Sequence, residues 1–114
     1  MEYLHTMVRV SNIEQSLHFY CDLLGLKEMR RIDRPEHKYS LIFVAAEKNP
    51  DSEVELTYNY DPEEYTGGRN FGHLAFRVDN IYDSCKRLID GGVPINRPPR
   101  DGRMAFVRSP DGIS

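Results

Sequence analysis

The sequence repeats itself, and this repeat restricts the possible folds more than any other feature of the chain. Residues 5–13 read His-Thr-Met-Val-Arg-Val-Ser-Asn-Ile, and residues 73–81 read His-Leu-Ala-Phe-Arg-Val-Asp-Asn-Ile. His, Arg, Val, Asn and Ile stand at the same places in both copies. A helical pattern follows each copy, and then an apolar strand around Phe43 or Phe106. Self-similarity of this kind indicates one supersecondary unit that is built twice.

The first unit, residues 1–60, has the pattern of a β-α-β-β-β module. Residues 4–10 alternate as in a strand, which places His5 and Arg9 on the same face. Ser11 opens a capping box, so a helix is expected to begin there, and Gly25 is expected to end it. Three more strands are expected over residues 27–32, 38–46 and 53–59.

The second unit, residues 70–114, follows a linker over residues 61–69 and is expected to form one domain with the first. Its expected elements are a strand over 70–78, a helix from an Asp79 cap to Ile89, and strands over 93–96 and 104–108. The repeat predicts a last strand that only begins at Ile113, so we expect the natural polypeptide to continue beyond Ser114. The predicted fold class is therefore α+β, with two β-α-β-β-β modules, the second lacking its last strand. They are expected to form a curved mixed sheet with helices on the outside.

Composition narrows the function classes. The net charge of -3 makes nucleic acid an improbable main partner, and no apolar run has the length of a membrane span. The first residues lack the basic and apolar regions of a signal peptide, which predicts a cytoplasmic protein. Cys21 and Cys85 are interpreted as reduced thiols in helices rather than as a disulfide or a nucleophile.

Three side chains are candidates for metal binding. His5 and His73 occupy equivalent places in the two first strands, and Glu55 lies in the last strand of the first unit. Imidazole and carboxylate ligands suit nickel, cobalt, zinc or iron. A single histidine in a strand is more often structural, and a single glutamate there usually faces solvent. Both histidines stand at the same place in a repeat, so we give metal binding the same weight as these ordinary roles.

Arginines accompany the candidate ligands. Arg9 and Arg77 are equivalent in the repeat, Arg69 precedes His73 by four residues, and Arg97 lies near the loop of the second unit. Guanidinium groups bind carboxylates through two hydrogen bonds, so such a cluster predicts an acidic small-molecule substrate. Ordinary surface charge is the alternative, and it is the preferred interpretation for Arg77.

Five segments in order resemble the glyoxalase I family of the vicinal oxygen chelate superfamily, over essentially the whole chain. They are His5-Thr6-Met7-Val8-Arg9-Val10, Tyr39-Ser40-Leu41-Ile42-Phe43-Val44, Glu55-Leu56-Thr57-Tyr58-Asn59, Gly72-His73-Leu74-Ala75-Phe76, and Ala105-Phe106-Val107 with Ser109-Pro110-Asp111-Gly112. Paired β-α-β-β-β modules are also the architecture of that superfamily.

The resemblance implies an activity and a site. The activity is the metal-dependent isomerisation of the hemithioacetal of methylglyoxal and glutathione to S-lactoylglutathione. His5, Glu55 and His73 would bind one divalent metal, nickel or cobalt by preference and zinc as the alternative, and Glu55 would also be catalytic. Glutathione would be the co-substrate. The residues that match its contacts in the family are Arg9, Asn59, Arg69 and, less securely, Arg97.

The resemblance also implies a homodimer whose sites are shared between chains, although pairing within one chain stays open. The second glutamate of the family, its main base, corresponds to a position two residues beyond Ser114. Two alternatives accompany the isomerase. One is another enzyme of the same fold, such as an epimerase, a dioxygenase or a thiol transferase. The other is a binding module without catalysis, against which the retention of His5, Glu55 and His73 argues.

Overall fold

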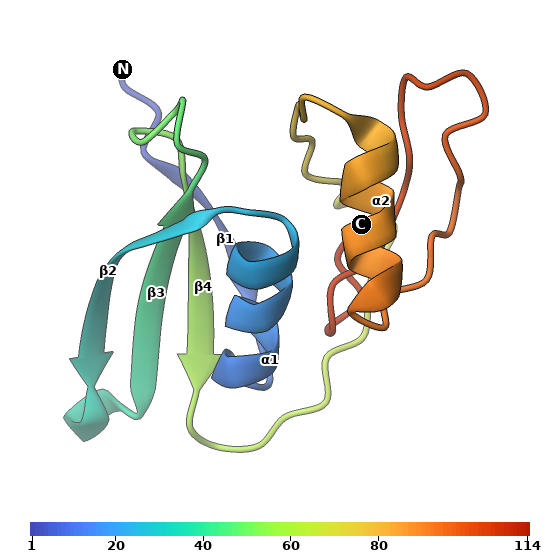
Figure 1. The fold of residues 1–114 in the computed structure, drawn as a ribbon. Coiled ribbons are helices and arrows are strands. Elements are labelled where there is room, and N and C mark those ends of the chain that lie inside the picture. Colours follow the sequence, from blue (N-terminus) through green and yellow to red (C-terminus); the bar gives the residue numbers. More distant parts are fainter.

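A mixed four-stranded sheet with helices against one face forms the body of the computed structural model, which describes residues 1–114 (Figure 1). The strand order is β1-β4-β3-β2; β1 runs parallel to β4, and the other neighbours are antiparallel. The elements are β1 (His5–Arg9), α1 (Ile13–Leu17), the π-helical η1 (His18–Leu23), β2 (Lys27–Arg34), the 3-10 helix η2 (Pro35–His37), β3 (Tyr39–Ala45), β4 (Glu53–Asn59) and α2 (Ile81–Asp90).

The first repeat forms the predicted β-α-β-β-β unit, and all four strands lie within two residues of their predicted bounds. The start of its helix differs by one residue. Asn12, not Ser11, is the N-cap, and its Oδ1 accepts a hydrogen bond from the Gln15 N–H at 2.9 Å. An amide at this position satisfies a free N–H of the first turn as well as a hydroxyl does. Ser11 is therefore available for another partner.

The hydrophobic core belongs almost entirely to the first repeat. Alternation along β1 buries Val8 and Val10 against α1 and η1, whereas Met7 and Arg9 of the opposite face are exposed. Leu88 of α2 is the one member of the core cluster from the second repeat. The other members are Val8, Val10, Phe19, Tyr20, Leu23, Leu26, Ile42, Val44, Val54 and Leu56.

The second repeat has its helix but not its strands. Helix α2 is confirmed, with Asn80 rather than Asp79 as the N-cap. The regular strands predicted over 70–78, 93–96 and 104–108 are wrong, because only an isolated bridge between Arg97 and Phe106 forms there.

Strands need hydrogen-bonded partners, and the segments of the second repeat have few of them. Segment 70–78 has one backbone hydrogen bond to the rest of the chain, from the Leu74 N–H to the Ser114 carbonyl at 3.0 Å. The sheet is accordingly mixed, as expected, but it contains only strands of the first repeat and does not curl around a second set.

The two repeats are joined along their helices, which lie side by side (Figure 1). Arg87 of α2 donates from Nε to the Leu23 carbonyl at the end of η1, at 2.6 Å. Gly91 packs so closely on Leu23 that a Cβ there would lie 2.5 Å from its Cδ2. Asp111 accepts from the Ser11 N–H at 3.0 Å and from its hydroxyl at 2.5 Å. None of the helices is long and apolar enough to cross a bilayer.

Replacing Asp111 by alanine is expected to loosen this junction. The substitution removes two hydrogen bonds to an ionised acceptor between residues 100 positions apart, and the expected loss is about 1–2 kcal/mol of the free energy of unfolding. Urea denaturation followed by circular dichroism measures it. Asp51→Ala, which removes an exposed carboxylate without such bonds, is the control. Equal midpoints for the two variants would contradict the role of Asp111.

Candidate active site

His5 and Glu55 meet on the face of the sheet that the helices leave open. They lie on the neighbouring parallel strands β1 and β4, with Met7 as the Cα partner of Glu55. His5 Nε2 is 2.8 Å from Glu55 Oε2, and Glu55 Oε1 accepts from the Thr57 hydroxyl at 2.8 Å. The Glu55 side chain is 12% exposed and that of His5 is 32% exposed. A nearly buried carboxylate is thus held in a fixed orientation beside a histidine that solvent reaches.

Phe43 forms the floor next to this pair. It is the Cα partner of Glu55 on β3, and the His5 ring packs edge-on against it with ring centroids 5.7 Å apart. Arg30 of β2 covers the other part of the Phe43 ring, with its guanidinium carbon 3.6 Å from the centroid. Four adjacent strands therefore build one continuous layer of side chains, which restricts the rotation of the His5 ring.

Two predicted substrate contacts share this face. Arg9 lies on β1 two positions beyond Met7 and is exposed, and its Cα partner is Thr57. Asn59 ends β4 on the same face as Thr57, and its Nδ2 lies 3.5 Å from the Tyr65 hydroxyl. A cationic group and an amide thus stand in a row beyond the His5–Glu55 pair.

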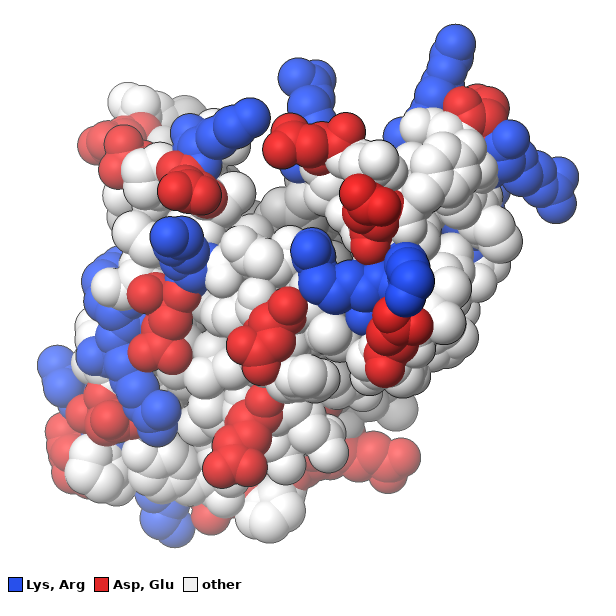
Figure 2. Space-filling model, viewed as in Figure 1, with Lys and Arg blue, Asp and Glu red and all other residues white.

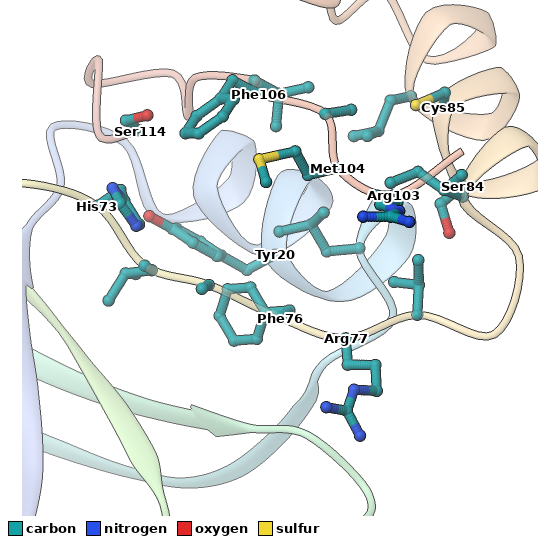
Figure 3. Close-up of a pocket in the computed structure, with 18 of the residues that line it drawn as sticks. Tyr20, His73, Phe76, Arg77, Ser84, Cys85, Arg103, Met104, Phe106 and Ser114 are labelled. Atoms are coloured by element: carbon teal, nitrogen blue, oxygen red, sulfur yellow. The ribbon is translucent and has the colours of Figure 1, made fainter. Parts of the chain in front are cut away.

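His73 lies at a different place, a cavity of about 470 Å³ where the second repeat meets η1 (Figure 3). The cavity is mostly apolar and lies between η1, α2, segment 73–79 and segment 102–107. Tyr20 of η1 points its hydroxyl toward His73 in the close-up. Burial raises the pKa of Tyr20, against the opposing effect of its hydrogen bond with Ser109, so this phenol is neutral and remains a hydrogen-bond donor near pH 7.

The structure thus brings together only part of the predicted site. It contains no group of three or more His, Cys, Asp or Glu side chains that could hold a metal ion. His5, Glu55, Arg9 and Asn59 share the open face of the sheet, whereas His73 and Arg97 belong to the second repeat and Arg69 belongs to the linker. Arg69 is exposed in the segment between the repeats, and Arg97 lies at the isolated bridge with Phe106.

The surroundings of the two histidines are alike. His73 packs edge-on against Phe106 with centroids 5.8 Å apart, as His5 does against Phe43, and Arg97 lies 5.8 Å from the Phe106 centroid. The repeat is therefore visible in the side-chain packing even where regular strands are absent. Each repeat supplies one half of a potential site, a histidine held against a phenylalanine and next to an arginine.

The half-site of the first repeat fits a divalent cation. His5 Nε2 and Glu55 Oε2 are 2.8 Å apart, which is hydrogen-bond distance as they stand, and two donors this close can also occupy neighbouring positions around one cation. A nitrogen donor and one carboxylate oxygen are also ligands that nickel, cobalt, zinc and iron accept. The Thr57 hydroxyl holds the second carboxylate oxygen, an outer contact of the kind that orients ligands.

Sequence reasoning missed three neighbours of the His5–Glu55 pair: Phe43, Arg30 and Glu53. Arg30 donates from Nε and Nη2 to the two carboxylate oxygens of Glu53, at 3.3 and 3.0 Å. The alternation of Glu53, Glu55 and Thr57 along one strand was available as a signal. The register with β2 and β3 was not, since cross-strand partners depend on the turns between the strands. Charged side chains of both signs are mixed over the surface that Figure 2 shows.

Comparison with known proteins agrees with this arrangement. Residues 3–114 match the model of the Glyoxalase/Bleomycin resistance protein/Dioxygenase superfamily. The chain is 45% identical over 118 residues to the lactoylglutathione lyase of Neisseria meningitidis serogroup B, covering 98% of this chain and 86% of that protein.

Solved structures give the same result. The trypanothione-dependent glyoxalase I of Leishmania major superimposes with a TM-score of 0.90 at 37% identity, over 99% of this chain and 82% of that one. Glyoxalase I of Zea mays gives 0.85 at 34% identity, over 96% of this chain and 41% of the maize chain. The paired histidine half-sites, the repeat and these similarities lead to one conclusion: the chain belongs to the glyoxalase/bleomycin resistance protein/dioxygenase superfamily and, within it, to the glyoxalase I family.

Proposed function

We propose that this protein is a lactoylglutathione lyase that converts the hemithioacetal of methylglyoxal and glutathione into S-lactoylglutathione. The observation that carries the proposal is the His5–Glu55 pair, a nitrogen and a carboxylate donor 2.8 Å apart on the open face of the sheet. Relatives named lactoylglutathione lyase, 45% identical over nearly the whole chain, support it. An epimerase, a dioxygenase or a binding module has no comparable support.

The reaction moves one proton between neighbouring carbons. The carbon that bears sulfur loses a proton, negative charge develops on the adjacent oxygens, and the second carbon gains a proton. His5 and Glu55 would hold a divalent cation, which would supply Lewis-acid stabilisation of those oxygens. The reaction involves no net oxidation, so hydride or electron carriers have no role in it.

Among residues 1–114, Glu55 is the carboxylate that we propose takes part in the proton transfer. Its carboxylate is nearly buried and keeps one oxygen on the Thr57 hydroxyl, so the other oxygen is presented in one direction. A general base must lie within hydrogen-bond reach of the proton that it removes. The Glu55 oxygen that faces His5 is proposed for both tasks, binding the cation and taking up the proton. It accepts the proton from the carbon that bears sulfur and returns it to the next carbon.

Arg9 and Asn59 are proposed to hold the thiol part of the substrate. Both lie on the same sheet face as Glu55, and Arg9 forms no ion pair that would compete with a substrate carboxylate. A guanidinium binds a carboxylate through two hydrogen bonds, and an amide can both donate and accept. The Leishmania relative uses trypanothione; glutathione is the proposal here, because the bacterial lactoylglutathione lyases share more sequence with this chain. Arg69 of the linker and Arg97 of the second repeat are further proposed contacts.

A homodimer is proposed to complete each site. In one chain His73 is not grouped with His5 and Glu55, and the second repeat leaves Phe71, Phe76 and Met104 exposed. Closed twofold pairing would place His73 of the partner subunit over the open face of the sheet. The maize chain, of which this chain covers 41%, has room for two such units. Nickel or cobalt as the metal, with zinc as the alternative, and a cytoplasmic location remain predictions.

His5→Ala and Glu55→Gln are expected to remove metal and activity together. Each removes one of two adjacent donors, and the expected fall in kcat/KM is more than about a hundredfold, since even outer contacts of a ligand are worth 10- to 100-fold. Metal content after dialysis and thioester absorbance after addition of nickel, cobalt or zinc are the measurements. His18→Ala, at an exposed helix position bonded to Asp22, is the matched control. Full metal content in either variant would exclude that residue as a ligand.

Mixing two inactive variants tests whether sites are shared. A dimer of one His5→Ala chain and one His73→Ala chain has one intact site if ligands come from both chains, and none if each site lies within a chain. Co-expression of the two variants should therefore restore about a quarter of wild-type activity, given random pairing. Activity that stays at the level of the separate variants would contradict shared sites and leave the isomerase proposal intact.

Arg9→Ala is expected to raise KM for the hemithioacetal by about tenfold while changing kcat less, since one hydrogen-bonded ion pair to the substrate is lost. Steady-state kinetics with the cognate metal measures both constants. Arg31→Ala, which removes another exposed strand arginine that pairs with Asp33, is the control. An unchanged KM would remove Arg9 from the substrate site.

A further inference from the structure

Arg30 extends over the open face of the sheet and forms an ion pair with Glu53, next to the His5–Glu55 pair. Its position on β2 is in register with Phe43, which in turn is the Cα partner of Glu55. The guanidinium stacks on the Phe43 ring at 3.6 Å and donates to both carboxylate oxygens of Glu53, at 3.0 and 3.3 Å. A planar cation with two parallel hydrogen bonds holds a carboxylate in one orientation.

Glu53 is the nearest potential competitor of Glu55. It precedes Glu55 by two residues on β4, so both side chains leave the same face about 7 Å apart along the strand. Glu53 is also the Cα partner of His5, and its side chain is 17% exposed. Without a restraint, two carboxylates of the same chemistry would stand on either side of the histidine nitrogen.

The carboxylates of Glu53 and Glu55 have different hydrogen-bond partners. Both oxygens of Glu53 accept from Arg30, whereas the oxygens of Glu55 face His5 and Thr57. The charges of Arg30 and Glu53 cancel, whereas Glu55 has no arginine or lysine partner and contacts only the His5 ring and the Thr57 hydroxyl. A divalent ion that meets this face therefore finds one nitrogen and one carboxylate donor.

On the basis of the proposed metal-dependent function, we propose that Arg30 is a positioning residue that keeps Glu53 out of the ligand set. It acts through Glu53 and does not contact the reacting atoms. By occupying Glu53, Arg30 leaves open a coordination position that the substrate oxygens need. If Glu53 were free, its carboxylate would bind the cation and take that position.

In the second repeat, an arginine stacks on a phenylalanine without pairing with a carboxylate. Arg97 lies over Phe106 beside His73, as Arg30 lies over Phe43 beside His5, but no carboxylate pairs with Arg97. Arginine stacked on phenylalanine is thus common to both repeats. The arginine pairs with a carboxylate only in the first repeat, where Glu53 stands near the proposed ligands. This is what the proposed role of Arg30 requires.

The test uses cobalt as the probe, in the full chain, with Arg30→Ala, Glu53→Gln and the double variant. Arg30→Ala should bind cobalt with an altered visible absorption spectrum and a kcat lowered about tenfold, the scale of outer-contact effects, with little change in KM. Glu53→Gln should keep the wild-type spectrum. The double variant should regain the wild-type spectrum and kcat, because the competing carboxylate is gone. Arg31→Ala, one residue along the same strand, controls for the loss of a paired arginine.

Three results would overturn the inference. A wild-type spectrum in Arg30→Ala means that Glu53 does not compete. A double variant as impaired as Arg30→Ala means that Arg30 acts on substrate binding or on the fold. A raised KM then indicates substrate binding. If the wild-type protein shows no cobalt spectrum, the proposed function itself is overturned. That failure is thus distinguishable from the first two. If Arg30→Ala melts well below Arg31→Ala, Arg30→Gln, which keeps a longer side chain over Phe43, replaces it in the same comparison.

Discussion

The parallel pairing of β1 with β4 is the constraint on which the rest of the site depends. These strands are far apart in sequence, and a parallel pair requires a crossover, here α1, η1 and the β2–β3 hairpin. Their register places Met7 opposite Glu55 and lets the His5 ring reach the Glu55 carboxylate. A shift by one residue would turn Glu55 into the core and Leu56 onto the open face, since side chains alternate. The buried row Val54 and Leu56 thus fixes the position of Glu55.

The same alternation separates stability from chemistry on the two faces of the sheet. The helix-covered face carries Val8, Ile42, Val44 and Leu56, all buried in the main core. The open face carries polar groups whose partners lie within the face, such as the pair of Arg30 and Glu53. Burial on one side supplies the rigidity, and the other side can then hold partly desolvated charges in fixed orientations. Fixed donors are what a metal site or an enolisation reaction requires.

The two repeats differ in how much regular secondary structure they contain. The first has a complete sheet and nearly all of the core, whereas the second has a capped helix and irregular segments around an apolar cavity. Isolated strands gain little without neighbours, because their backbone groups then bond to water. The packing of each histidine on its phenylalanine nevertheless persists in both repeats. Local side-chain contacts can therefore preserve a repeat where backbone pairing does not.

The sequence by itself determined the repeat, the four strands of the first unit, helix α2 and the sharing of one face by His5 and Arg9, because each of these follows from local periodicity and capping. It could not decide the cap by Asn12 over Ser11, since both side chains suit that position. Only the tertiary structure decided that Glu55 meets His5, that Arg30 pairs with Glu53 across Phe43, and that His73 lies apart from them in one chain. Those facts depend on strand register and on contacts between residues distant in sequence, and periodicity carries no information about either.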